Sequence, residues 1–142
     1  MTIHTILQGR SAEIHSCTAD MSVSQAVEIL AEKRIGALPV LDGEGVAGIF
    51  SERDVLHCLR KHGRAAMDHV VHDVMTSDVI FVERTKSVMG ALSLMTKRRI
   101  RHLPVVEDDK LIGFVSIGDL VKYRIDKIES EAAAMRDYIQ SA

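Results

Sequence analysis

The strongest constraint on this chain is that its second half repeats its first. A shift of 65 positions aligns residues 22–56 with residues 87–121 without a gap, and eleven aligned pairs are identical, far more than chance gives. The phrase GIFSERDV at residues 48–55 returns as GFVSIGDL at residues 113–120 and keeps its Gly, Ser and Asp. The chain is therefore a tandem duplication, and both copies should adopt one fold.

Hydrophobic spacing predicts the same elements in each copy. An apolar stripe at helical spacing follows residue 22 and returns after residue 87. Each stripe leads into an apolar strand, a polar turn and a second strand, with LPVLD and VAGIFS in one copy and LPVVE and LIGFVS in the other. A second helix follows, from Glu52 to about His62 and from Ile117 onward, and short strands at residues 14–18 and 79–82 precede the first helices. The predicted order is β-α-β-β-α twice, an α/β fold of the α+β type.

The repeats set the domain boundaries. We assign residues 5–62 to the first repeat, 63–73 to a linker, 74–124 to the second repeat and 125–142 to a C-terminal helical extension. A unit of about 60 residues buries little surface alone. The two repeats are therefore expected to pack sheet to sheet, share a core and fold as one unit.

Composition argues against several classes of partner. The chain of 142 residues carries 18 Lys and Arg against 20 Asp and Glu, has 4% aromatic residues and lacks Trp, which argues against nucleic-acid binding. No apolar run approaches the roughly 18–20 residues that span a bilayer, and residues 1–16 do not resemble a signal peptide, so no membrane partner is expected. Cys17 and Cys58 form no disulfide framework, and two free thiols suit a reducing cytoplasm.

The repeated phrase permits two interpretations. Ser51 and Ser116 stand where a strand ends and a helix begins, and Asp54 and Asp119 follow three residues later. Ser-x-x-Asp is a capping box, in which each side chain satisfies a backbone N–H group. The same helix N-terminus also suits a phosphate, and the carboxylate beside it can accept both hydroxyls of a ribose. Spacing alone does not choose between them.

In its motifs the chain resembles a pair of CBS domains, also called a Bateman module, of the small stand-alone bacterial type. The LPV strands, the repeated G-h-h-S-x-x-D phrase and VHDVMT at residues 71–76 carry this resemblance. It implies pseudo-twofold packing and clefts that bind AMP, ADP, ATP, NAD(H) or S-adenosylmethionine. Asp119 and Asp54 would then hold ribose, with Ser116 and Ser51 near ribose or phosphate. The residues implied to line the base pocket are Ile80, Ile100, Pro104, Ile14, Ile35 and Pro39.

The two copies differ in charge beside these positions. KRRIRHLPV in the second copy supplies Arg99, Arg101 and His102, where EKRIGALPV in the first has Gly36 and Ala37. Conversely, the first copy has Arg53 within its Ser-x-x-Asp phrase, where the second has Gly118. Charge alone therefore predicts one strong adenylate site, centred on Ser116 and Asp119, and a weaker or empty one at Ser51 and Asp54.

Catalysis and metal binding are not expected. The pairs Cys58 and His62, and His69 and His72, have helical spacing, but no further ligand is fixed beside them, so they are interpreted as surface or linker residues. No candidate nucleophile has a base identified by motif. The protein is predicted not to be an enzyme.

The C-terminal segment carries a second stripe, formed by Ile125, Ile128, Ala132, Met135 and Ile139. This face either covers the protein's own core or pairs with another chain, and the resemblance to disc-shaped CBS dimers points to a homodimer.

Together these features predict a regulatory module that senses cellular energy state. It would bind AMP first, then NAD(H) or ATP, and signal to a separate, unidentified protein. S-adenosylmethionine fits less well because the basic run favours ligands with phosphates. The alternative is a ligand-free interaction module that acts as a dimer.

Overall fold

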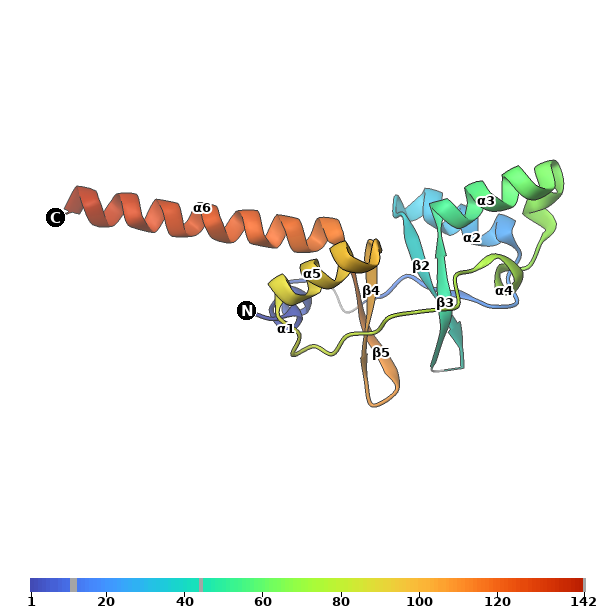
Figure 1. Cartoon of the computed structure of the whole chain (residues 1–142), viewed down its shortest axis with the longest axis horizontal. Coiled ribbons are helices and arrows are strands. Elements are labelled where there is room, and N and C mark those ends of the chain that lie inside the picture. The colour runs from blue at the N-terminus through green and yellow to red at the C-terminus, as the bar shows by residue number, and fades with distance from the viewer. Residues whose placement is uncertain (11–12, 44, 142) are drawn as a thin grey trace.

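The computed structural model describes residues 1–10, 13–43 and 45–141, and it shows two repeats side by side with a long helix leaving the second (Figure 1). The first repeat contains β1 (Cys17–Thr18), α2 (Val23–Lys33), β2 (Ala37–Asp42), β3 (Gly45–Ser51) and α3 (Glu52–His62). The second contains α5 (Val88–Arg98), β4 (His102–Glu107), β5 (Lys110–Ser116) and α6 (Ile117–Ser141). The α+β fold of two repeats with a C-terminal helix is confirmed.

The two repeats agree in detail. Both hairpins are antiparallel, and both shift register at the same place, between Val40 and Leu41 in the first and between Val105 and Val106 in the second. Helices α2 and α5 both begin after a serine whose side chain accepts a backbone hydrogen bond. Duplicated residues therefore occupy duplicated positions.

The prediction of short strands before the first helices, at residues 14–18 and 79–82, is largely wrong. Of residues 14–18 only β1 pairs, parallel to β2, and of residues 79–82 only Val82 forms an isolated bridge with Val105. Most of the remaining residues line clefts between the repeats instead, Ile14 and His15 one cleft and Val79 and Ile80 the other. A strand pattern in the sequence thus marks cleft-lining segments here.

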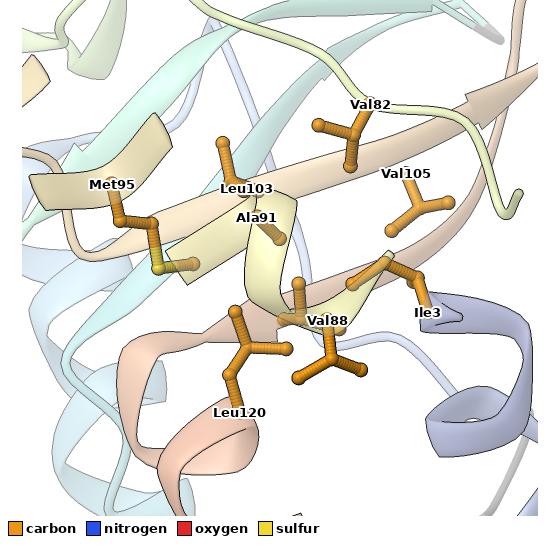
Figure 2. Packing of buried hydrophobic residues seen from close by; sticks show 9 residues of the cluster. Ile3, Val82, Val88, Ala91, Met95, Leu103, Val105 and Leu120 are labelled. Atoms are coloured by element: carbon orange, nitrogen blue, oxygen red, sulfur yellow. The ribbon is translucent and has the colours of Figure 1, made fainter. Parts of the chain in front are cut away.

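The prediction that the two repeats share a core is also wrong, because the buried hydrophobic residues form two clusters, one in each repeat. Each cluster lies between a hairpin and the helices that cover it, and Figure 2 shows the second. The first contains Cys17, Val23, Ala26, Leu30, Leu38, Val40, Phe50 and Val71. The second contains Ile3, Val82, Val88, Ala91, Met95, Leu103, Val105, Val115 and Leu120.

A short N-terminal helix, α1 (Ile3–Gln8), belongs spatially to the second repeat. Ile3 is fully buried in the second cluster, and its N–H donates to the Lys86 carbonyl at 2.9 Å. The sequence interpretation had placed residues from 5 onward in the first repeat. The chain therefore starts on the second repeat before it builds the first.

The segment assigned as a linker is packed. It forms a 3-10 helix, η1 (Gly63–Asp68), and one helical turn, α4 (Val71–Val74). Val71 is fully buried in the first cluster. This segment thus completes the first repeat as it leads to the second.

Helix α6 covers little of its own repeat. Leu120, near its start, is its buried residue, and the long C-terminal part extends away from the body in Figure 1. Ile125 and Ile128 are each 49% exposed, and Met135 and Ile139 are more exposed still. The stripe therefore does not serve the protein's own core.

Close approach of another segment explains the repeated glycine. A Cβ atom at Gly48 would lie 2.7 Å from the Thr76 carbonyl oxygen, because Thr76 bridges to Ile49. A Cβ atom at Gly113 would lie 2.7 Å from a methyl group of Leu7 in α1. The equivalent glycines of the two sheets therefore contact different neighbours, the backbone of Thr76 at Gly48 and the side chain of Leu7 at Gly113.

This difference predicts unequal effects of one substitution. We expect Gly48→Ala to destabilise the protein by about 1–3 kcal/mol, because it collides with backbone. Gly113→Ala should be nearly neutral, since the Leu7 side chain can turn aside and alanine suits a strand better than glycine. Urea unfolding of both variants checks this, and equal losses would contradict it.

Candidate functional site

Two clefts lie between the repeats, and each is built from both of them. The Asp54 cleft, about 400 Å³, combines Ser51–Asp54 of the first repeat with residues 76, 78–80 and 99–102 of the second. The Asp119 cleft, about 630 Å³, combines Ser116 and Asp119 with residues 13–15 and 34–37 of the first repeat. Each Ser-x-x-Asp phrase therefore faces the segments that lead into the other repeat's strands.

A capping box fixes Asp54 at the start of α3. Its Oδ2 accepts hydrogen bonds from the Ser51 N–H at 2.9 Å and the Ser51 hydroxyl at 3.1 Å, while its own N–H donates to Ser51 Oγ at 3.4 Å. Its Oδ1 accepts a hydrogen bond from the Thr76 hydroxyl at 3.0 Å. The carboxylate is thus held at the mouth of a helix N-terminus, and Thr76 was not found from the sequence.

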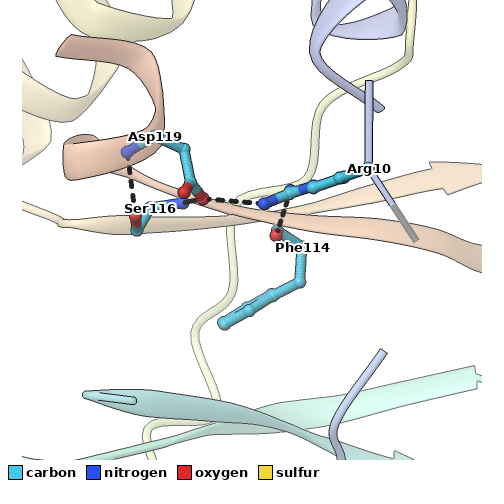
Figure 3. Close-up of polar contacts among 4 residues, drawn as sticks. All are labelled: Arg10, Phe114, Ser116 and Asp119. Carbon is cyan, nitrogen blue, oxygen red and sulfur yellow. Dashed lines mark hydrogen bonds and ion pairs between the residues drawn. The ribbon is translucent and has the colours of Figure 1, made fainter. Parts of the chain in front are cut away.

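Asp119 has the same cap and one additional partner. Its Oδ2 accepts the Ser116 N–H at 2.8 Å, and its N–H donates to Ser116 Oγ at 3.1 Å. Arg10 contributes a second contact to the carboxylate, from Nη1 at 3.1 Å, and donates from Nη2 to the Phe114 carbonyl at 2.7 Å (Figure 3). A ligand reaching Asp119 must share it with Arg10 or displace Arg10.

The structure corrects the grouping of the basic residues. Arg99 and Arg101 line the Asp54 cleft, together with Arg53, and neither lines the Asp119 cleft with which the sequence grouped them. Among the described residues, none of these three arginines takes part in an ion pair. The two arginines that the sequence placed beside Asp119 therefore lie at the Asp54 cleft.

The predicted base-pocket residues divide between the clefts. Ile80 and Ile100 line the Asp54 cleft, and Ile14 and Ile35 line the Asp119 cleft. Pro39 and Pro104 lie buried within β2 and β4 and are not among the residues lining either cleft. The four isoleucines thus supply apolar surface to both clefts.

Each cleft also has an arginine in a left-handed backbone conformation. Arg34 and Arg99 end α2 and α5 with φ of 54° and 55°, a position that glycine normally occupies. The conformation costs a non-glycine residue about 1–2 kcal/mol. Both arginines line a cleft, so the strained positions carry side chains at the two places where a ligand could use them.

His102 lies between the two clefts and lines both. Its ring stacks on Phe114 with a centroid distance of 5.5 Å. Burial lowers the pKa of His102 below its usual value; Asp119 and Glu52 act in the opposite direction, while Arg101 lowers the pKa further. The ring is therefore held in its neutral form to lower pH than a free histidine.

A further hollow of about 720 Å³ lies between the hairpin tips. Its lining includes Glu83, Glu107, Asp108 and Asp109, and Arg84 there forms an ion pair with Glu107. Neither Ser-x-x-Asp phrase contributes to it. The hollow thus lacks the features shared by the two clefts.

The cysteines and histidines outside the clefts behave as side chains of the fold. Cys17 and Cys58 are free and buried, and burial raises the pKa of the Cys17 thiol to about 11, which keeps it unreactive. The rings of His62 and His69 lie 4.0 Å apart. Within the described parts of the chain, no group of three or more His, Cys, Asp or Glu residues is placed to hold a metal ion.

Paired clefts built from exchanged segments define a tandem-repeat module of two similar domains. The CBS domain family matches residues 10–61 and 71–126. The chain belongs to this family and contains a pair of its domains.

Similar proteins share this pair. A CBS-domain protein from Burkholderia ambifaria is 40% identical, with a TM-score of 0.83 over 89% of this chain and 95% of that one. CBSX2, whose structure was determined in complex with AMP, is 30% identical, with a TM-score of 0.74 over 88% of this chain and 96% of that one. CBSX3 of Arabidopsis thaliana, named as mitochondrial, is 38% identical over 129 residues, which are 87% of this chain and 63% of CBSX3. The chain therefore spans less than two thirds of that relative.

The pKa of His102 predicts a pH dependence of stability. As pH falls through about 6.5, the unfolded chain takes up a proton at this histidine before the folded protein does, so this residue makes stability fall. We expect His102→Gln to lose less stability than wild type between pH 8 and pH 5.5. Thermal unfolding at each pH measures this, and parallel curves for both proteins would disprove the assignment.

Proposed function

We propose that this chain is a non-catalytic regulatory module that binds an adenosyl nucleotide in the Asp54 cleft. AMP is the expected ligand, followed by NAD(H) or ATP. The observation that carries the proposal is a set of three arginines, Arg53, Arg99 and Arg101, around a carboxylate at a helix N-terminus, none of which forms an ion pair with another described residue. Guanidinium groups and the N–H groups of a helix start are the protein's best donors to phosphate.

Each part of such a ligand has a matching surface. Asp54 would accept the ribose hydroxyls, because its Oδ1 has a lone pair beyond the Thr76 hydrogen bond and Thr76 can turn away. Ile80 and Ile100 would contact the adenine ring, and Arg99 and Arg101 the phosphate. A volume of about 400 Å³ is within the range of small-ligand sites. The AMP complex of CBSX2, a protein of the same fold, supports this choice.

The Asp119 cleft is proposed as the weaker site or as unused. Arg10 already neutralises Asp119, and Gly36 stands where its counterpart has Arg101. A nucleotide in the Asp119 cleft would lack the cation that Arg101 supplies in the Asp54 cleft, and it would compete with Arg10 for the Asp119 carboxylate.

Ligand binding would change how the repeats sit against each other, because one molecule contacts both. A ligand that fits one arrangement better shifts the population toward that arrangement. The receiver of the signal would be a separate protein, and the two free, buried cysteines suit a reducing compartment such as the cytoplasm. Among the described residues, no helix has the length and apolar character to cross a bilayer. The rival proposal is an interaction module that has lost its ligand.

Two matched variants test the ligand site. Asp54→Ala and Asp119→Ala remove the same capping box, so each should cost a similar amount of stability, on the order of 1 kcal/mol. A nucleotide at about 100 times its dissociation constant adds roughly 2.7 kcal/mol, which should raise the unfolding midpoint by about 5–10 °C. We expect this shift in wild type and in Asp119→Ala, and its loss in Asp54→Ala.

The measurement is thermal unfolding with AMP, ADP, ATP, NAD, NADH and S-adenosylmethionine in turn, on protein shown to carry no bound nucleotide. A shift retained by Asp54→Ala and lost by Asp119→Ala would move the site to the other cleft. No shift with any ligand would favour the interaction module.

Substitution of the two arginines with left-handed backbone, Arg34 and Arg99, distinguishes an effect on ligand binding from an effect on folding stability. Arg99→Gly should leave the stability of the free protein unchanged or raise it by up to about 1 kcal/mol, because glycine relieves the left-handed conformation. It should nevertheless weaken nucleotide binding about tenfold or more, since a phosphate contact is lost. Arg34→Gly is the matched control and should relieve the same strain without changing affinity at the Asp54 cleft. Calorimetric titration of wild type and the two variants measures the affinities. Equal affinities for all three proteins would show that Arg99 does not contact the ligand.

A further inference from the structure

The exposed stripe of α6 has strict coiled-coil spacing. Its apolar residues are separated by alternating steps of four and three, an average of 3.5, which keeps one face of a helix against a partner helix. The stripe contains Val121, Ile125, Ile128, Ala132, Met135 and Ile139. We call these six residues the seam.

The protein's own body contacts the opposite side of α6. Tyr123 and Lys127 approach the sulfur of Met1, with Tyr123 Oη at 2.8 Å and Lys127 Nζ at 2.6 Å. At 100° per residue, position 123 faces almost directly away from the seam, and position 127 lies well around the helix from it. The seam is therefore open: Val121 is 42% exposed and Ile139 66% exposed.

A helix with this face is not expected to stand alone. From Val121 to Ser141 it extends about 30 Å with its apolar face in water, whereas helices in proteins gain most of their stability by packing such a face. A second helix along the seam would bury that face.

The charges beside the seam identify the partner and its direction. Arg124 and Glu131 lie on one flank, Glu129 and Arg136 on the other. In a parallel pair, each residue of the first flank meets the residue five positions later in the other chain. Arg124 would then face Glu129, and Glu131 would face Arg136, each pair occurring twice by symmetry. The helix complements a second copy of itself.

The antiparallel arrangement of the same seam is disfavoured. There Glu129 would meet Glu129, Glu131 would meet Glu131, and Lys122 would meet Arg136. Like charges would face each other at three places, which penalises this orientation. Within one chain Glu131 also pairs with Lys127 at 3.9 Å, a contact loose enough to be shared with a partner.

We propose that α6 is a homodimerisation helix, in which two copies of the chain join their seams as a parallel, in-register coiled coil with Arg124 and Glu131 of each copy facing Glu129 and Arg136 of the other. The proposal does not depend on ligand binding, because no seam residue lines the Asp54 cleft or the Asp119 cleft. Because α6 starts at the Asp119 phrase, the two bodies lie at the same end of the dimer.

The first test is the mass of the full chain in solution. Light scattering coupled to gel filtration should give twice the chain mass of 15.7 kDa for wild type. Ile128→Lys should give a monomer, because it places two charges in the seam. Ser130→Lys adds the same charge on the opposite face and should remain a dimer. A monomeric wild type, or a dimeric Ile128→Lys, would overturn the proposal.

The second test addresses direction and register. Arg124→Glu should weaken the dimer by roughly tenfold, and the double variant Arg124→Glu with Glu129→Arg should restore it. Ile139→Cys should form a disulfide-linked dimer on mild oxidation, since the two residues meet in a parallel pair. In an antiparallel pair they would be about 27 Å apart, so absence of the cross-link in a dimeric protein would refute the parallel arrangement.

Discussion

The hydrogen bonds between Ser and Asp at each strand end fix the start of a helix and at the same time hold a carboxylate at a cleft. In both repeats the carboxylate accepts the serine N–H, at 2.9 Å in the first and 2.8 Å in the second, so a strand, a helix start and an acid are fixed together. The sequence offered capping and ligand binding as alternatives. The structure makes them compatible, because the oxygen that closes the cap belongs to a group lining a cleft. A ligand at Asp54 would meet a carboxylate that folding has already oriented, which lowers the cost of ordering it.

What could be predicted from sequence is what depends on local spacing. The bounds of α3 and the positions of the hairpins follow from hydrophobic period and from the turns between strands. Helix α1 was missed because six residues with one buried side chain, Ile3, carry too little periodicity to detect. The short strands before α2 and α5 were overestimated because an apolar segment that lines a cleft has the same pattern as one that pairs.

The site was half predictable for a related reason. Ser51, Asp54 and their counterparts were found because the phrase is repeated, whereas the partners of each phrase depend on tertiary structure. Arg10 meets Asp119 across more than a hundred residues, and Thr76 meets Asp54 through a bridge to β3. Only the exchange of segments between repeats brings these groups together, and no spacing in the sequence reports it.

The exchange of segments between the repeats also explains where the arginines that differ between the two copies lie in the fold. Arg53 of the first copy aligns with Gly118, and Arg101 of the second copy aligns with Gly36, so in sequence each copy has an arginine where the other has glycine. In the fold they converge, since the Asp54 cleft takes its helix start from the first copy and its strand segment from the second. The Asp119 cleft takes the corresponding strand segment with Gly36, and its helix start contains Gly118. A duplicated domain with two equal clefts can therefore specialise one of them through changes in both repeats, and the Arg10 contact then neutralises the carboxylate in the other.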